Sequence, residues 1–209
     1  MTTTVHRFRN LPAHGVGAAL ALALVACGGG GNPLGNPSVV ENPPPETSGQ
    51  KLSFAYFQKC INPIFLAQLQ ININGVISTN TCAASGCHDT VSGTGGAFRV
   101  VPGAQPVDLA DAGNTPESIR ETDMYKNFYS SAGEVFLSSP TQSRLIAKPM
   151  LLNVLHGGGL IFEDAEDPNV KLIQYWITHP MPQGQDEFST ASDTMFTPAD
   201  PETGECNVE

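Results

Sequence analysis

The sequence predicts a mainly α-helical domain with long loops rich in glycine and proline. Three observations lead to this fold class. Apolar residues recur at helical spacing in three segments of the chain, and a residue that favours helix starts precedes each segment. The chain of 209 residues also contains 21 glycines and 17 prolines, which is too many for a tidy helical bundle. We therefore expect short helices separated by extended loops.

The first 26 residues have the organisation of an export signal. Two arginines lie near the start without any acidic residue, and an apolar run follows from Val16 to Ala26. This run is too short to cross a bilayer, which takes about 20 apolar residues. The residues Leu24-Val25-Ala26-Cys27 resemble a bacterial lipobox, in which the cysteine carries lipid after cleavage. The alternative is an ordinary signal peptide with an incidental cysteine.

Residues 27–50 are predicted to be a lipidated cysteine followed by a disordered linker. The segment is rich in Gly, Asn and Pro and has almost no large apolar side chain, so it cannot bury enough surface to fold. Gly28 follows Cys27 where an inner-membrane retention signal often has Asp. We therefore expect attachment to the membrane through the N-terminal lipid, in the bacterial cell envelope, with the outer membrane favoured over the inner.

The folded domain is expected over residues 51–185, beginning with a helix over 53–69. Ser53 is its predicted N-cap, and Pro63 is expected to kink it. A turn-rich segment at 75–81 leads into a long loop over 89–106. The glycines at 92–96 in this loop suit a close approach of the backbone to a ligand.

Two further helices are predicted in the second half of the domain. Thr115-Pro116-Glu117 opens the first of them, with Ile119, Tyr125, Phe128 and Tyr129 on one face. Asp167-Pro168 opens the last helix, which is expected to end near His179 before Pro180. Its predicted apolar face consists of Val170, Ile173, Trp176 and Ile177. Residues 186–209 have only acidic charges and are expected to form a solvated tail.

The segment Cys82-Ala83-Ala84-Ser85-Gly86-Cys87-His88 is the most specific motif in the chain. Two thiols can add to the two vinyl groups of a haem, and the histidine that follows directly can bind the iron. The usual spacer has two residues, whereas this one has four, and Gly86 supplies the backbone freedom for the extra length. The alternatives are a Cys82–Cys87 disulfide or half of a zinc site with His88.

The five cysteines of the chain can all be assigned a role in an oxidising compartment. Lipid on Cys27 and one haem on Cys82 and Cys87 leave Cys60 and Cys206 as a pair that could form a disulfide. Two disulfides, Cys82–Cys87 and Cys60–Cys206, satisfy the same count. The number of cysteines therefore agrees with a haem without requiring it.

The charge of the chain limits its partners. The formal net charge is −10, and removal of the signal segment takes away Arg7 and Arg9, which leaves about −12. Nucleic acid and anionic lipid headgroups are therefore poor partners. The acidic tail could alternatively dock a basic redox protein, although the sequence identifies no such partner.

The order of these parts resembles the cytochrome c-like domains of bacterial exported proteins. The resemblance covers roughly residues 52–182 and rests on five features: the first helix, the Cys-x4-Cys-His motif, the Ser-x-Leu-Ile-x-Lys-Pro turn at 143–149, the His-Gly-Gly-Gly segment at 156–159, and Gln174-Tyr175-Trp176-Ile177 in the last helix. The four-residue spacer departs from the usual pattern of the family. The resemblance implies a monohaem electron-transfer protein rather than an enzyme.

The second axial ligand of such a haem is expected in the loop before the last helix. His156 is preferred, because the glycines after it allow close approach to a flat ring and the resemblance places a histidine there. Met150 is the alternative, whereas Met181 and His179 are weaker candidates. Two other functions stay open from the sequence: a disulfide-stabilised lipoprotein without redox activity, and the haem module of a larger oxidoreductase that could also handle peroxide.

Overall fold

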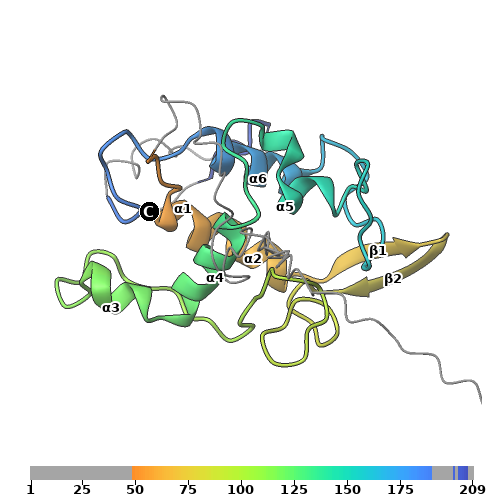
Figure 1. Cartoon of the computed structure of the whole chain (residues 1–209), viewed down its shortest axis with the longest axis horizontal. Helices are drawn as coiled ribbons and strands as arrows, with labels where there is room; N and C mark the ends of the chain where they lie inside the picture. The colour runs from red at the N-terminus through yellow and green to blue at the C-terminus, as the bar shows by residue number, and fades with distance from the viewer. Residues whose placement is uncertain (1–48, 190–199, 201, 207–209) are drawn as a thin grey trace, which may run out of the picture. The chain divides into compact units, whose positions relative to one another are not determined.

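The computed structural model describes residues 49–189, 200 and 202–206, which belong to one compact unit, Asn42–Glu209. The predicted signal peptide, most of the predicted linker and the candidate lipid site at Cys27 lie outside the described residues. Figure 1 shows short helices joined by long loops, together with one two-stranded sheet. The sheet was not predicted from the sequence.

The first helical segment begins where the sequence predicted. Ser53 caps it, since its Oγ accepts a hydrogen bond of 3.2 Å from the backbone N–H of Tyr56. The segment consists of α1 (Phe54–Tyr56), a π-helical turn (Phe57–Ile61) and α2 (Asn62–Leu66). The widened turn ends two residues before Pro63, whose nitrogen has no hydrogen to donate. The helix ends at Leu66, three residues earlier than predicted.

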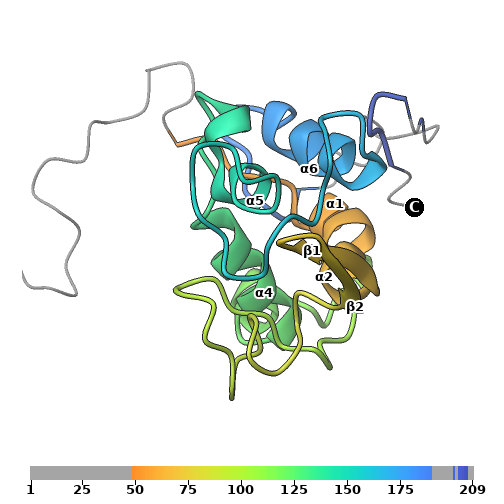
Figure 2. The same ribbon diagram turned by 90° about the vertical axis from the view of Figure 1, so that its right-hand side faces the viewer.

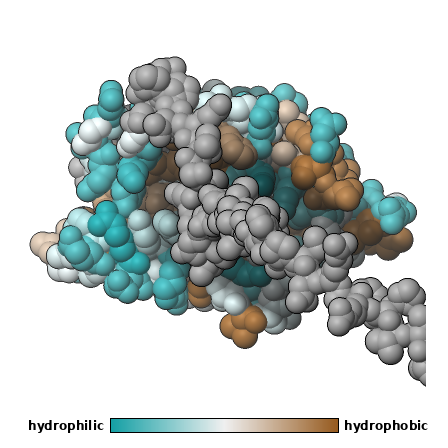
Figure 3. All heavy atoms as spheres, viewed as in Figure 1, coloured by the Kyte–Doolittle hydropathy of each residue, from teal (hydrophilic) through white to brown (hydrophobic). Residues whose placement is uncertain are grey.

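A β-hairpin follows α2, where the sequence predicted only a turn-rich entry to the cysteine motif. Strands β1 (Leu69–Ile73) and β2 (Val76–Asn80) pair antiparallel, with Ile73 opposite Val76. Asn74 and Gly75 at the tip both have positive φ, as a two-residue type I′ turn requires. Asn-Gly is the sequence signal for this turn, and the prediction overlooked it. Val76 and Ile77 are largely exposed, and Figure 3 shows apolar surface at this end of the hairpin.

The helix predicted to open at Thr115 is in fact two helices. Helix α3 (Pro116–Arg120) ends after five residues, and α4 (Asp123–Ala132) begins again behind its own cap, Thr122. The Thr122 hydroxyl accepts from the backbone N–H of Tyr125 at 3.1 Å. The break changes the helical phase, and Tyr129, predicted on the apolar face, is 72% exposed.

The core forms between the first helical segment, α4 and the last helix. Helix α6 (Pro168–Thr178) is capped by Asp167, and the four residues of its predicted apolar face are buried. The Trp176 indole N–H donates to the carbonyl of Ser53 at 2.9 Å, which joins the first and last helices. The short helix α5 (Arg144–Ala147) follows a 3-10 turn and lies beside α6 in both ribbon views (Figures 1 and 2).

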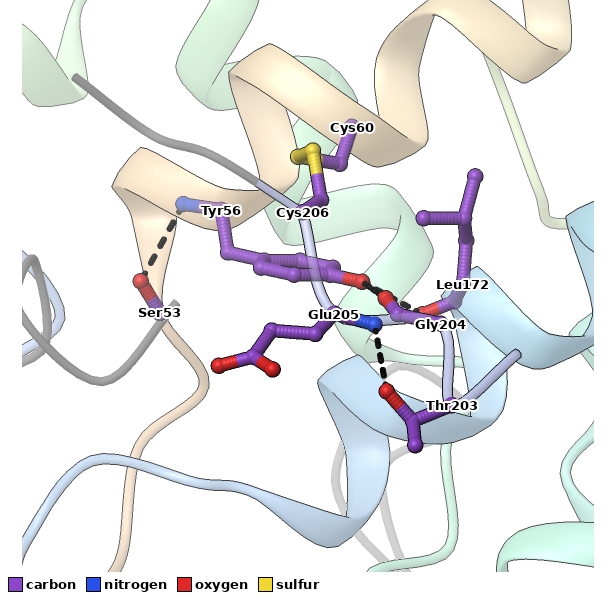
Figure 4. Close-up of a disulfide and its surroundings, with 8 residues drawn as sticks. All are labelled: Ser53, Tyr56, Cys60, Leu172, Thr203, Gly204, Glu205 and Cys206. Atoms are coloured by element: carbon purple, nitrogen blue, oxygen red, sulfur yellow. Dashed lines mark hydrogen bonds between the residues drawn. A yellow bond between two sulfur atoms is a disulfide. The ribbon is translucent and has the colours of Figure 1, made fainter. Parts of the chain in front are cut away.

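A disulfide between Cys60 and Cys206 ties the end of the chain to the first helical segment (Figure 4). Beside it the Tyr56 hydroxyl reaches the carbonyl oxygens of Gly204 and Leu172. Burial of this phenol raises its pKa well above the ordinary value. The residues around the disulfide are therefore packed against the domain.

The start of the predicted solvated tail is also packed. Glu187 is buried, and its carboxylate accepts hydrogen bonds of 3.0 Å from both Arg120 and the Tyr125 hydroxyl. Phe188 packs edge-on against Phe54, with 5.4 Å between ring centres. The expectation of a solvated tail is thus wrong at residues 187–188, because the buried acid has a cationic partner, Arg120, that lies far away in the sequence.

Candidate functional site

A cavity of about 410 Å³ lies among the described residues, within the size range of small-molecule and cofactor sites. Its walls come from α2, the hairpin, the segment 80–98, α5 and the loop 155–158. Most of the wall is apolar, and the larger apolar side chains are Ile64, Phe65, Leu69, Ile71, Phe98, Leu145, Leu155, Ile161, Phe162 and Ile173. Cys82, Cys87, His88 and His156 all line the same cavity. The two cysteines and two histidines singled out from the sequence are therefore brought together.

The imidazole rings of His88 and His156 both line this cavity and lie close to parallel. Their planes are 11° from parallel and their centres are 6.3 Å apart, too far for direct ring contact. Two imidazoles on opposite sides of one metal ion need about 2 Å from the metal to each nitrogen and about 1 Å more to each ring centre. The observed separation of the ring centres fits such a pair.

Each of the two imidazoles is oriented by a backbone carbonyl. His88 Nδ1 lies 3.1 Å from the carbonyl oxygen of Phe98, and His156 Nδ1 lies 2.9 Å from that of Gly159. Because a carbonyl can only accept, each Nδ1 carries a proton, and in the neutral form of each ring the Nε2 atom keeps its lone pair. This is the arrangement that metal-bound histidines adopt, with the outer nitrogen donating to a carbonyl.

The surroundings of His88 favour its neutral form. Burial lowers the pKa of this imidazole, and the nearby basic side chains of His156, Arg99 and Lys148 act in the same direction, against the Phe98 carbonyl. A histidine must be neutral to bind a metal ion. His88 is thus available as a ligand at neutral pH.

No family model, curated protein or solved structure matches this chain. The function must therefore be inferred from the site itself.

Cys82 and Cys87 are free thiols in the cavity wall and form no disulfide with each other. The four-residue spacer between them folds into consecutive turns, and the backbone N–H of His88 donates to the carbonyl of Cys82 at 2.9 Å. Gly86 has φ +82°, a left-handed backbone conformation that glycine adopts readily and that was expected of it in this spacer. Burial, together with the neighbouring Cys87, raises the pKa of the Cys82 thiol to about 12.

Glycines allow close contacts of the backbone in both of the loops that carry the histidines. A Cβ on Gly95 would lie 2.6 Å from the His88 ring, so the glycine-rich loop packs against the imidazole itself. On the other side Gly159 has φ +74°, and a Cβ there would lie 2.5 Å from the carbonyl oxygen of Asn72. These contacts show why each loop contains glycine at these positions.

The remaining candidate ligands lie elsewhere. Met150 is half-buried against the hydrophobic core and is not among the residues that line the cavity. Met181 is fully buried in the core, and His179 stacks on Tyr175 with 3.7 Å between ring centres. Across the described residues, no three His, Cys, Asp or Glu side chains cluster as a metal site.

Two features of the site were not anticipated from the sequence. The carbonyls of Phe98 and Gly159 orient the imidazoles, and backbone acceptors leave no signal in a side-chain pattern. Lys148 and Arg144 also line the cavity. Both belong to the Ser-x-Leu-Ile-x-Lys-Pro turn, which was noticed only as a resemblance. In the part of the chain that the structure describes, no helix is long and apolar enough to cross a membrane.

Proposed function

We propose that this protein is a monohaem c-type cytochrome that carries single electrons in the bacterial cell envelope. Cys82 and Cys87 would hold the haem through thioether bonds, with His88 and His156 as the two axial ligands. The proposal is supported above all by the parallel rings of the two histidines, 6.3 Å apart and both with Nδ1 bonded to a carbonyl.

The other donors and walls of the cavity suit the same group. Two free thiols lie beside His88 in the sequence, and the apolar wall suits the faces of a large flat ring. When bound, a haem supplies an iron that accepts and releases one electron by cycling between Fe(III) and Fe(II). The protein's own residues bind and orient it and limit the access of water to it.

Two histidine ligands favour a lower reduction potential than one histidine and one methionine. Met150 was the alternative second ligand, and its place against the core supports the choice of His156. The proposal therefore includes a low-spin haem of comparatively low potential.

The place of the protein in the cell is inferred from the sequence. Lipid on Cys27 would anchor the chain, with the outer membrane favoured, and the linker would hold the domain away from the membrane surface. Mass spectrometry of the mature protein would detect the lipid as an addition to a chain that begins at Cys27. A mature chain that begins elsewhere would contradict the anchor.

The haem is tested by expressing the protein with a haem-maturation system and recording the reduced pyridine spectrum. We expect a covalent c-type band with one haem per chain. Absence of this band, with Cys82 and Cys87 recovered as thiols or as a disulfide, would reject the cytochrome function.

The axial ligands are tested by His156→Ala, with Met150→Leu as the matched control. We expect loss of the low-spin Soret spectrum in His156→Ala and no change in Met150→Leu, because the His156 ring lies parallel to that of His88 in the cavity wall and Met150 does not line the cavity. An unchanged spectrum in His156→Ala would show that another group is the second ligand.

A further inference from the structure

Lys148 lies in the wall of the cavity and has no counterion among the residues that the structure describes. Arg144 and Lys148 are the two lysine or arginine residues that line it. Arg144 is paired with Glu134, at 3.7 Å between a guanidinium nitrogen and a carboxylate oxygen. Lys148 is half-buried and has no carboxylate partner within 4.0 Å among the described residues.

The half-buried Lys148 side chain brings a positive charge to the wall of the cavity. A charge in this place favours an anion or a hydrogen-bond acceptor as its neighbour. The chain is not short of carboxylates, since its formal net charge is −10. That none of them pairs with Lys148 in the described structure suggests that the anion belongs to a ligand.

Lys148 forms the C-cap of α5, on a different wall of the cavity from the two thiols. Both ribbon views place α5 and the segment that follows β2 on opposite sides of the fold (Figures 1 and 2). A haem has its two vinyl groups towards one edge and its two propionate carboxylates at the opposite edge. If thioethers form at Cys82 and Cys87, the carboxylate edge is directed away from them, towards α5.

We propose that Lys148 binds a propionate carboxylate of the haem, at the edge of the ring that the thioethers direct towards α5. This inference rests on the proposed cytochrome function. Lys148 is assigned as a positioning residue for an anionic group. Arg144 has no such role in this proposal, because it is paired with Glu134.

The inference is tested on haem-loaded protein with Lys148→Gln, Lys148→Arg and Lys126→Gln. Lys126 is the matched control, because it is exposed and pairs with Asp123 on the surface. The readout is the bending vibration of the haem carboxylates in the resonance Raman spectrum, which responds to a hydrogen bond at the carboxylate. We expect a shift in Lys148→Gln, and wild-type frequencies in Lys148→Arg and Lys126→Gln.

Each other outcome is decisive. A wild-type frequency in haem-loaded Lys148→Gln overturns the assignment of Lys148 and leaves the cytochrome function intact. If Lys148→Gln loads no haem, loading restored by Lys148→Arg supports the assignment, and failure of both variants contradicts it. Absence of the c-type band in the wild-type protein instead rejects the proposed function itself.

Discussion

The backbones of Asn72 and Leu160 exchange two hydrogen bonds. The N–H of Asn72 donates to the carbonyl of Leu160 at 2.8 Å, and the N–H of Leu160 donates to the carbonyl of Asn72 at 3.0 Å. This pair joins β1 to the loop that carries His156. One residue earlier, the Gly159 carbonyl accepts from the His156 ring. The unpredicted hairpin therefore helps to hold the imidazole in its orientation opposite His88.

Gly159→Ala is expected to disturb this connection. The added Cβ would lie 2.5 Å from the Asn72 carbonyl oxygen in a backbone conformation with φ +74°. The left-handed conformation alone costs an alanine about 1–2 kcal/mol, and the contact adds to it. We expect a loss of about 2 kcal/mol in the free energy of unfolding, measured with urea.

Gly157→Ala is the matched control, because a Cβ there meets no atom within 4 Å and its φ is not in the left-handed region. We expect Gly157→Ala to unfold like the wild type. Equal stabilities of the two variants would show that the contact between Asn72 and Gly159 is unimportant.

Leu151→Gly is expected to stabilise the domain. Leu151 has φ +54° in the turn that follows α5, and the N–H groups of Leu151 and Leu152 donate back to the carbonyls of Lys148 and Ala147, respectively. This is a Schellman cap, in which the left-handed position is usually glycine. Glycine removes the backbone strain of a leucine in the left-handed conformation. This gain in stability should exceed the loss of apolar burial, which is small because Leu151 is 40% exposed.

We expect a gain of about 0.5–1 kcal/mol in Leu151→Gly, measured by thermal and urea unfolding. Leu152→Gly is the control, with similar exposure at 43% and no positive φ. It should be neutral or destabilising. A gain of equal size in both variants would assign the effect to the loss of exposed apolar surface.

Arg120→Ala is expected to destabilise the domain in a pH-dependent way. Burial opposes ionisation of Glu187, but its own backbone N–H, Arg120 and Tyr125 together hold its pKa below the ordinary value of 4.5. A lowered pKa stabilises the folded state above about pH 4.5, and this contribution is lost as the pH falls through the folded-state pKa. The guanidinium is partly exposed, at 40%, so solvent screening reduces its effect.

We expect Arg120→Ala to lose about 1–2 kcal/mol at pH 7 and clearly less at pH 3, measured by urea unfolding at both values. Lys126→Ala removes the exposed pair with Asp123 and should have little effect at either pH. A loss in Arg120→Ala that is the same at pH 3 and pH 7 would mean that packing, and not the charge pair, is responsible.

The parts of the fold that could be predicted depend on neighbours in the sequence. Ser53, Thr115 and Asp167 each accept from a backbone N–H two or three residues ahead, so a short segment was enough to predict each helix start. The apolar face of α6 followed from its spacing. Asn74-Gly75 was a local signal of the same kind and was overlooked.

The outcomes that could not be predicted depend on distant partners. Glu187 was expected in solvent because nothing nearby in the sequence neutralises it, yet Arg120 does so 67 residues away. Thr122 is the N-cap of α4 and a residue type that favours helix starts. The sequence alone did not predict the break there, because a change of helical phase between α3 and α4 resembles an imperfect apolar face of one longer helix. Met150 and His156 were both chemically able to bind iron.

By itself the sequence determined the chemistry available to this protein: two thiols joined to a histidine, a second histidine among glycines, and a leader that resembles an export signal. The order of the residues along the chain and their local spacing are enough to identify these groups. Only the tertiary structure decided that His156 lies opposite His88 while Met150 packs against the core, and that Lys148 lines the same cavity. These relations join segments about 60 residues apart, and they depend on backbone pairing and burial that no local pattern contains.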